Sequence, residues 1–382
     1  MKIVLATGIY PPDIGGPATY VCALANELSR REMEVIVVTY CHSPTLPECQ
    51  KHEGGSLVTS HSSDAVEIVK VKFGRCPICR WFRYARALKK VGKDADIIYA
   101  FSSVSCGVPL KFARLKKPKK ILRLGGDFVW ERYTAVGGRR SLREWYGRRS
   151  FVYSFTRLLV YSLLKSFDHI VFSTRFQEEI YEGAFKRLPP HCVIENAMPM
   201  GMSEIHVARH PFSILFMGRF VGFKNLPNLL KAIKKIPEIR LTLVGDGPKK
   251  EKLSKLVSNL KLRDRVMFAA PVHGEEKRKV FEGHDLLVIP SITEISPNIA
   301  LEARSCGLPV LLTKETGLSE NLRKGMVIRD LKSVDSIVNS IEEIRNNYQD
   351  FALEASDRAE RRGWGEVAAE SLRLFEDGKR SN

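Results

Sequence analysis

The sequence has little cysteine and no long hydrophobic run. Eight cysteines in 382 residues are too few and too scattered for a disulfide scaffold, and Cys22 and Cys306 lie in apolar contexts typical of buried residues in a reducing cytosol. The most apolar stretch, 151–167, is interrupted by Arg157 and Lys165 and falls short of the ~20 residues that a spanning helix needs. The short apolar run after Lys2 leads to no signal-peptide cleavage site. We therefore expect a cytoplasmic protein, soluble or peripheral on the inner face of the cell membrane.

Motifs for metal and dinucleotide binding are incomplete. The CxxC at 76–79 has no second CxxC or His pair at zinc-finger distance. Asp94-Ala95-Asp96 matches a DxD metal-binding pattern, but it precedes a strand, on the side of an α/β sheet away from the crevice. The glycine pair Gly15-Gly16 is not GxGxxG, so a dinucleotide fingerprint is not supported. We expect no metal and no cofactor.

Acidic residues are outnumbered by basic ones: 43 Asp and Glu against 61 Lys and Arg leave a formal net charge of +18. Anionic partners are therefore expected: nucleotides, nucleic acid or acidic membrane surfaces. Two basic-aromatic stretches, 74–93 and 139–165, interleave Trp, Tyr and Phe with Arg and Lys. Such helices rest on anionic lipid headgroups or pack on a core with a solvated basic face, and both interpretations stay open. No RRM, KH or zinc module accompanies the charge, which disfavours nucleic-acid binding.

Strand-like apolar runs alternate with amphipathic helical patterns twice along the chain, which is long enough for two domains. The first half opens with a βαβ unit, and the alternation restarts at Ser213–Met217. We predict an α/β protein with a first domain at 1–196, a linker at 197–211 and a second domain at 212–363. The helix at about 364–382 has no strand after it and is expected to pack back on the first domain.

The sequence EISPNIALEARSCG predicts a helix that begins where a buried strand ends. Ser296 fits the N-cap, Pro297 the first helical position and Gly307 the position just past the helix end. The N–H groups around Pro297, Asn298 and Ile299 would then face the crevice at the carboxyl ends of the strands. Such a helix N-terminus is an anion site that fits a diphosphate.

Two glutamates flank this predicted anion site. Glu302 lies five positions beyond Pro297, about 7 to 8 Å along the helix axis at ~1.5 Å per residue. An ionised Glu accepts two hydrogen bonds from the vicinal diol of a ribose. Glu294, before the helix, would lie on the sugar side of the phosphates. A loop glutamate and an unrelated helical glutamate would give the same spacing, so this alternative stays open.

Other candidate residues follow neighbouring strands. Arg219 and Lys224 come after the strand at 213–217, where they can neutralise a phosphate and the charge that develops on it as a glycosidic bond breaks. The turn 245–248, Gly-Asp-Gly-Pro, allows close approach to a ligand or simply joins strand to helix. Asp127 lies in the loop just after the strand at 119–124 and is either an acceptor-side residue or a turn aspartate.

Taken in order, these motifs resemble the family 4 retaining glycosyltransferases of the GT-B fold. The resemblance covers nearly the whole chain and is strongest from 213 to 320. It is carried by Gly15-Gly16, by Gly218-Arg219 with Lys224, by Gly245-Asp246-Gly247-Pro248, and by the E-x7-E pair Glu294 and Glu302. It implies two Rossmann-like parallel-sheet domains facing each other across a cleft.

The resemblance also implies roles for individual residues. Arg219 and Lys224 become the diphosphate clamp, Glu302 the ribose ligand and Glu294 a contact of the donor-sugar hydroxyls. The backbone of Gly16 would approach the donor phosphate or the acceptor. No divalent metal is implied. Many relatives have a histidine where this chain has Gly126 and then Asp127, so either Asp127 takes over that contact or the contact is lost.

We therefore predict a peripheral membrane glycosyltransferase that moves a sugar from a UDP-, GDP- or ADP-linked donor to an acceptor hydroxyl, with anomeric configuration retained. The acceptor is predicted to be a glycan or lipid-linked precursor of a polysaccharide, lipopolysaccharide or glycolipid. The two basic-aromatic stretches would contact the anionic membrane surface. Alternatives are a sugar-nucleotide epimerase or hydrolase on the same fold and, less favoured, a nucleic-acid-binding protein.

Overall fold

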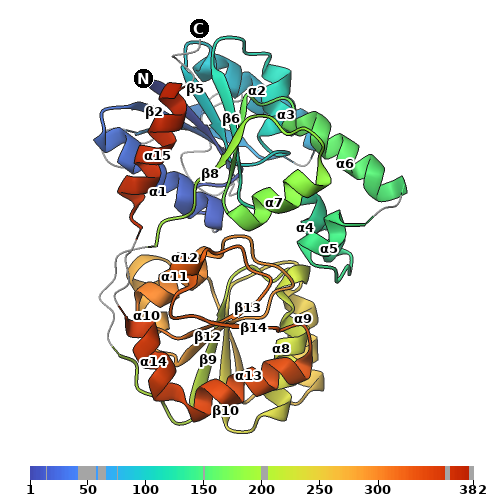
Figure 1. Cartoon of the computed structure of the whole chain (residues 1–382), viewed down its shortest axis with the longest axis vertical. Helices are drawn as coiled ribbons and strands as arrows, with labels where there is room; N and C mark the ends of the chain where they lie inside the picture. The colour runs from blue at the N-terminus through green and yellow to red at the C-terminus, as the bar shows by residue number, and fades with distance from the viewer. Residues whose placement is uncertain are drawn as a thin grey trace. The chain divides into compact units, whose positions relative to one another are not determined.

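The computed structural model describes residues 1–13, 15–41, 57–58, 66–74, 76–148, 151–198, 205–357 and 362–377. Most of the polar segment after residue 41, Arg75, Arg149 and part of the predicted linker lie outside the described residues. The chain forms two compact units (Figure 1). The first unit comprises Met1–Phe128, Tyr146–Asn196 and the segment from Trp364; the second comprises Val129–Trp145 and Ala197–Gly363. Residues 129–145, predicted within the first domain, group with the second unit.

The first unit is built on a sheet with the strand order β3-β4-β2-β1-β5-β6-β7-β8. All neighbouring strands are parallel except β3, which runs antiparallel to β4. The predicted parallel α/β sheet is thus confirmed. The strands are β1 (Lys2–Ala6), β2 (Glu34–Cys41), β3 (Leu57–Val58), β4 (Val66–Lys72), β5 (Ile97–Ala100), β6 (Lys119–Leu124), β7 (His169–Phe172) and β8 (His191–Val193).

Helices complete the first unit, and the C-terminal helix is one of them. The ring of Tyr20 on α1 lies 5.1 Å from that of Trp364 at the start of α15, and Arg31 Nη2 donates to the Gly365 carbonyl at 2.8 Å. These contacts join the two ends of the chain within one unit. The helices are α1 (Gly16–Arg30), α2 (Pro77–Gly92), α3 (Gly107–Ala113), α6 (Phe151–Leu164), α7 (Arg175–Ala184) and α15 (Trp364–Asp377).

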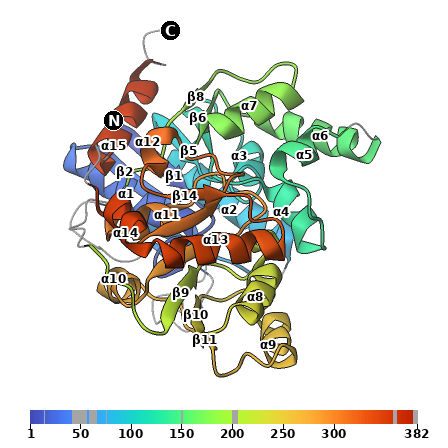
Figure 2. The same ribbon diagram turned by 60° about the horizontal axis from the view of Figure 1, so that its bottom comes forward.

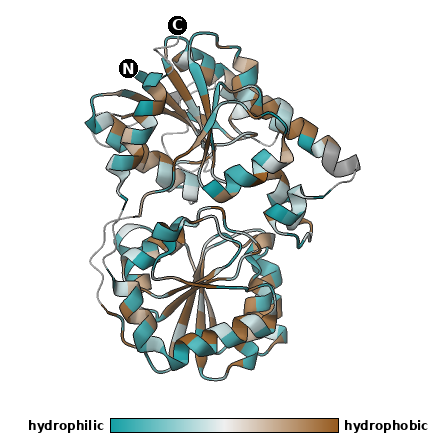
Figure 3. Cartoon of the chain, viewed as in Figure 1, coloured by the Kyte–Doolittle hydropathy of each residue, from teal (hydrophilic) through white to brown (hydrophobic). Residues whose placement is uncertain are grey.

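The second unit contains an all-parallel sheet with the order β11-β10-β9-β12-β13-β14. Its strands are almost wholly apolar (Figure 3), because helices lie on both sides of them (Figures 1 and 2). The strands are β9 (Phe212–Met217), β10 (Ile239–Val244), β11 (Val266–Ala269), β12 (Leu286–Ile289), β13 (Val310–Thr313) and β14 (Val327–Arg329).

The strand order of the second unit decides where a ligand can bind. β9 pairs with β10 on one side and with β12 on the other, so the chain reverses its direction of winding between β9 and β12. The loops that leave the carboxyl ends of these two strands diverge and form a crevice, the usual ligand site of such folds.

The helices of the second unit are α4 (Phe128–Ala135), α5 (Leu142–Tyr146), the 3-10 turn η2 (Gly222–Lys224), α8 (Leu226–Lys235), α9 (Lys250–Asn259), α10 (Gly274–Glu282), α11 (Asn298–Ser305), α12 (Glu320–Arg323), α13 (Val334–Asn346) and α14 (Tyr348–Ser356).

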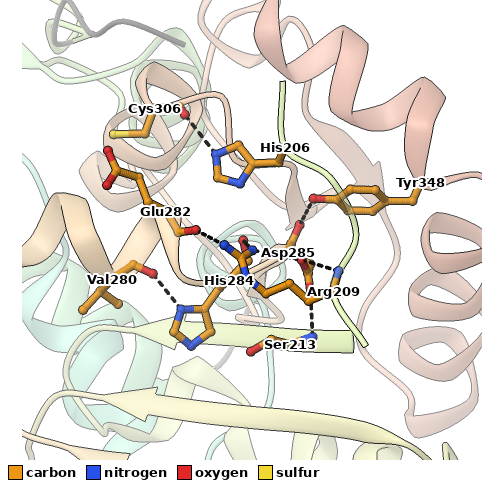
Figure 4. A network of polar contacts seen from close by, with 9 residues as sticks. All are labelled: His206, Arg209, Ser213, Val280, Glu282, His284, Asp285, Cys306 and Tyr348. Carbon is orange, nitrogen blue, oxygen red and sulfur yellow. Dashed lines mark hydrogen bonds and ion pairs between the residues drawn. The ribbon is translucent and has the colours of Figure 1, made fainter. Parts of the chain in front are cut away.

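A polar network fixes the segment that enters the second sheet (Figure 4). The fully buried Asp285 carboxylate accepts hydrogen bonds from Arg209 N and Nη1, each at 3.1 Å, and from Ser213 N at 2.7 Å. The Tyr348 hydroxyl donates to the Asp285 carbonyl at 3.0 Å. This network lies at the amino edge of the sheet, where β9 and β12 begin, and so leaves the carboxyl edge to the loops that carry the candidate residues.

Candidate active site

Glu294 and Lys224 form a buried ion pair at the carboxyl edge of the second sheet. Lys224 Nζ lies 2.5 Å from Glu294 Oε1, and the two side chains are only 14% and 8% exposed. Ser291 Oγ donates to the same carboxylate oxygen at 2.5 Å. The backbone of Glu294 is held by Glu315 and Gly317 through two hydrogen bonds of 2.8 Å. The structure therefore brings together the residues predicted for the sugar side and for the phosphate clamp.

The loop after β9 carries the second predicted clamp residue. Arg219 is exposed, and its side chain forms no hydrogen bond or ion pair with any residue that the structure describes. The adjoining turn η2 is bonded to the loop after β12, because Ile292 N–H donates to the Phe223 carbonyl at 2.8 Å. Arg219 is therefore a cation available to an anionic ligand beside the fixed Lys224.

The glycines of the turn after β10 serve the packing of two loops. Gly245 and Gly247 have φ of 143° and 154°. A Cβ on Gly245 would lie 2.1 Å from the Gly218 carbonyl oxygen, and one on Gly247 would lie 2.7 Å from Phe220 N. Phe220 N–H also donates to the Asp246 carbonyl at 2.8 Å. The close approach that these glycines permit is thus to protein backbone, the loop that carries Arg219.

Helix α11 begins one residue later than the sequence predicts. Pro297, and not Ser296, is the N-cap, because its ψ of 96° is extended and its carbonyl accepts from Ala300 N–H at 3.0 Å. The prediction of Ser296 as N-cap is therefore wrong. Its hydroxyl oxygen is buried and has no hydrogen-bond partner among the described residues. The predicted end is confirmed, since Gly307 follows the helix with φ of 78°.

The start of α11 supplies backbone donors at the crevice. The helix follows β12 directly along the chain, so its first turn, with Asn298 and Ile299, lies at the carboxyl edge of the sheet. The N–H groups of a first helical turn have no partner within the helix, and the helix dipole adds positive potential there. The arrangement favours an anion beside Arg219 and Lys224.

Glu302 is paired with a lysine that sequence reasoning missed. It forms an ion pair with Lys277 of α10, and the two side chains are 16% and 24% exposed. Lys277 is one of three consecutive cations, with Arg278 and Lys279, and the sequence does not show which of the three would pair with Glu302. A ribose diol bound to Glu302 would have to share the carboxylate with Lys277 or displace it.

Sequence reasoning also missed the segment 129–145, which buttresses both candidate loops. The Trp130 ring, 2% exposed, lies 5.2 Å from that of Phe223 in η2. Leu142 N–H donates to Thr293 Oγ1 at 3.0 Å, next to Glu294. A Cβ on Gly222 would lie 2.2 Å from the carbonyl oxygen of Thr134. Helices α4 and α5 therefore hold η2 and the loop after β12 in place.

The first-unit candidates lie in two different surroundings. The Asp127 carboxylate is 2% exposed, and its Oδ2 accepts hydrogen bonds of 2.6 Å from the hydroxyls of Tyr146 and Tyr181. Burial, and then the Asp127 charge, raise the pKa of Tyr146. Gly16 begins α1 at the carboxyl end of β1, after Gly15 with φ of 157°. Asp127 is thus bound to the tyrosines of its own unit.

Two further observations concern metals and membranes. Among the described residues, no group of three or more His, Cys, Asp or Glu side chains is arranged to hold a metal ion. Asp96 of the DxD pattern accepts the Lys2 N–H at 2.8 Å at the amino edge of the first sheet. Within the same described ranges, no helix has both the length and the hydropathy needed to cross a membrane.

The whole chain superposes on solved structures of low sequence identity. Sucrose-phosphate synthase from Thermosynechococcus elongatus aligns with a TM-score of 0.78 and 18% identity over 100% of both chains. Anabaena HepE in complex with UDP and glucose aligns with a TM-score of 0.70 and 15% identity, over 98% of this chain and 99% of that chain. With its two Rossmann-like units, the chain has the GT-B fold.

Sequence comparison supplies the family. Residues 14–199 match the family described as Glycosyltransferase Family 4, and residues 204–362 match Glycosyl transferases group 1. The chain belongs to glycosyltransferase family 4, as the motifs of the sequence suggested.

Two curated relatives are similar over part of their length. D-inositol 3-phosphate glycosyltransferase from Pseudarthrobacter chlorophenolicus is 32% identical over 177 residues, 43% of this chain and 42% of that protein. Lipopolysaccharide core biosynthesis glycosyltransferase LpsD from Rhizobium meliloti is 32% identical over 123 residues, 32% of this chain and 35% of that protein. The chain thus spans less than half the length of these relatives.

Proposed function

We propose that the chain is a retaining glycosyltransferase that passes a sugar from a nucleotide-sugar to an acceptor hydroxyl. The observation that carries the proposal is the buried ion pair of Lys224 and Glu294 beside the N-terminus of α11. A buried ammonium and backbone N–H groups around one crevice suit a diphosphate, whose negative charge grows as the sugar departs. The buried carboxylate suits sugar hydroxyls, which donate hydrogen bonds to it.

Each residue has a part in the proposed reaction. Arg219, Lys224 and the first turn of α11 hold the diphosphate, Glu294 accepts from hydroxyls of the donor sugar, and Glu302 accepts from the ribose. The bond between the anomeric carbon and the phosphate oxygen breaks, and the acceptor oxygen bonds to that carbon on the same face. The departing phosphate takes the acceptor proton. The cations neutralise this phosphate, so the proposal requires no metal ion.

The acceptor is proposed to be a lipid-linked or surface-glycan precursor at the inner face of the cell membrane. Both basic-aromatic stretches support this, because α2 exposes Ile78 and Phe82 and α6 exposes Phe155 and Leu158. Exposed apolar side chains beside many cations are typical of surfaces that lie on anionic membranes. A relative named for lipopolysaccharide core synthesis supports an acceptor of this kind.

A donor panel and two variants test the proposal. UDP-, GDP- and ADP-sugars are compared by thermal shift, since a ligand at 100 times its Kd stabilises by about 2.7 kcal/mol. Lys224→Ala and Glu302→Ala should each lower kcat/KM for transfer by about 100-fold. Lys231→Ala on the exposed face of α8 is the control and should behave as wild type. Folded site variants with undiminished turnover would remove the assignment.

The epimerase or hydrolase alternative is separated by the products. A transferase forms the glycosylated acceptor and releases the nucleoside diphosphate only in step with it. An epimerase returns a changed nucleotide-sugar without acceptor, and a hydrolase releases free sugar. Product analysis with and without acceptor therefore decides among the three.

A further inference from the structure

A cation-lined cavity lies in the first unit, and the candidate residues Asp127 and Gly16 do not line it. Its volume is about 390 Å³. Lys120 lies near the start of β6, and Phe167 lies just before β7, so the cavity opens at the amino edge of the sheet. Asp127 and Gly16 follow the carboxyl ends of their strands. The cavity is lined by Gly107, Leu110, Lys111, Arg114, Lys120, Ser162, Lys165, Ser166 and Phe167.

The charges of this cavity are unbalanced. None of the cations Lys111, Arg114, Lys120 and Lys165 forms an ion pair with a carboxylate of the described residues. The neighbouring Asp168 carboxylate accepts a hydrogen bond from the backbone N–H of Lys120 at 2.7 Å. Like charges around one hollow repel each other, and a bound anion relieves that repulsion. The Ser162 hydroxyl adds a donor that suits phosphate oxygens, whereas the Ser166 hydroxyl donates to the Ser162 carbonyl at 3.3 Å.

An apolar surface leads along α6 to the cavity. Phe155, Leu158 and Leu159 are 56%, 62% and 57% exposed. Leu158 and Leu159 lie three and four residues after Phe155, and Ser162 and Lys165 continue this spacing, so these side chains follow one face of the helix. A molecule that spans this face would present hydrocarbon at one end and a negative group at the other.

A second apolar contact lies beside the same cations. The exposed rings of Phe82 on α2 and Phe112 on α3 stack with centroids 5.4 Å apart. Phe112 lies directly after Lys111 and two residues before Arg114 in the sequence, so an exposed aromatic ring lies close to two cations that line the cavity. This mixture matches the boundary between headgroups and acyl chains in a bilayer.

We propose that this cavity binds the phosphate of an anionic phospholipid headgroup while the exposed side chains of α2, α3 and α6 enter the acyl boundary. The inference deepens the proposed function, on whose membrane-bound acceptor it rests. It assigns the membrane contact to one cavity with defined donors, so binding depends on where the cations lie and not only on how many there are.

Vesicle binding with a charge-matched pair of variants tests the proposal. Lys111→Gln/Arg114→Gln/Lys165→Gln removes three cavity charges, and Lys231→Gln/Lys234→Gln/Lys255→Gln removes three exposed charges from α8 and α9 of the second unit. Cosedimentation is measured with vesicles of phosphatidylglycerol mixed with phosphatidylcholine, and with pure phosphatidylcholine. The cavity variant should bind the anionic vesicles at least about tenfold more weakly than the control variant. Leu158→Ser should weaken binding without any change in charge.

Three results would overturn the inference: equal loss in both triple variants, undiminished binding by the cavity variant, or wild-type protein that ignores phosphatidylglycerol. Inorganic phosphate is the second probe. If it binds the cavity while vesicle binding stays independent of the cavity cations, the ligand is a free phosphate and the lipid assignment fails. The cavity variant should keep wild-type thermal shifts with nucleotide-sugars. Vesicle binding thus tests the lipid site, and the thermal shifts test donor binding separately.

Discussion

The carboxylate of Glu294 is the charge that balances the buried Lys224 ammonium in the proposed site. Glu294→Gln keeps the shape of the side chain and an oxygen for the Ser291 hydroxyl, but leaves the Lys224 ammonium without its counter-charge. We expect kcat to fall by about 100-fold or more, as for loss of a preorganised electrostatic contact. Ser291→Ala, which removes one hydrogen bond to the same oxygen, should cost about tenfold or less. Steady-state kinetics at saturating donor checks both, and equal kcat in wild type and Glu294→Gln would contradict the role.

Asp127 is expected to act on the stability of the first unit. Two buried tyrosine hydroxyls donate to one of its oxygens, and Asp127→Ala leaves both without that partner. The free energy of unfolding should fall by about 3 kcal/mol, since hydrogen bonds to charged groups contribute about 1.5 to 3 kcal/mol. Tyr146→Phe and Tyr181→Phe should each lose less. Urea unfolding measures the change. An Asp127→Ala variant as stable as wild type but inactive would instead favour a contact with the acceptor.

At the scale of elements, α4 and α5 are expected to set the donor affinity through η2. Gly222→Ala would push a methyl group to within 2.2 Å of the Thr134 carbonyl oxygen and separate the two elements. We expect a loss of stability of about 1 to 3 kcal/mol and a raised KM for the donor. Gly183→Ala in α7 meets no atom within 4 Å and should stabilise the chain by up to about 1 kcal/mol. If both variants keep the wild-type KM, α4 does not position η2.

Sequence patterns predict helices and strands well where buried residues follow one another in a regular pattern along the chain. The runs DLLVIPS and GLPVLLT lie in the parallel sheet of the second unit, which is covered on both faces, so their centres are continuously apolar and mark β12 and β13. The end of α11 was also predictable, because Gly307 takes a positive φ. Its start was not, because both Ser296 and Pro297 suit the first turn and only the backbone angles separate them.

Contacts between distant elements could not be predicted in this way. The partner of Lys224 lies 70 residues away and that of Leu142 lies 151 residues away. The helical and strand periods of the sequence relate only near neighbours, so they cannot reveal such pairs. The grouping of 129–145 with the second unit has the same origin, because Trp130 looks like any buried aromatic until its neighbour Phe223 is known. Lys277 beside Glu302 likewise depends on how α10 and α11 pack.

At the scale of the whole molecule, acid should weaken the first unit through His169. Burial, with Lys119 and His191 nearby, lowers the pKa of this imidazole from 6.5 to about 4. Between pH 6.5 and 4, His169 is protonated in the unfolded chain but neutral in the folded chain. The free energy of unfolding should therefore fall as pH falls from 6.5 to 4. His169→Gln should flatten this dependence. Urea titrations above and within the window check it, and an unchanged slope in the variant would contradict the assignment.

The division of the chain into units bears on how it is made. The path crosses between them four times, near residues 128, 145, 196 and 363, so neither lobe is one continuous stretch. When the first 196 residues have been synthesised, α15, which packs against α1, has not yet been made. The first lobe therefore cannot be completed before α15 is made. A fragment of residues 1–196 would lack α15, and a fragment of residues 197–363 would lack the segment 129–145 of the second lobe.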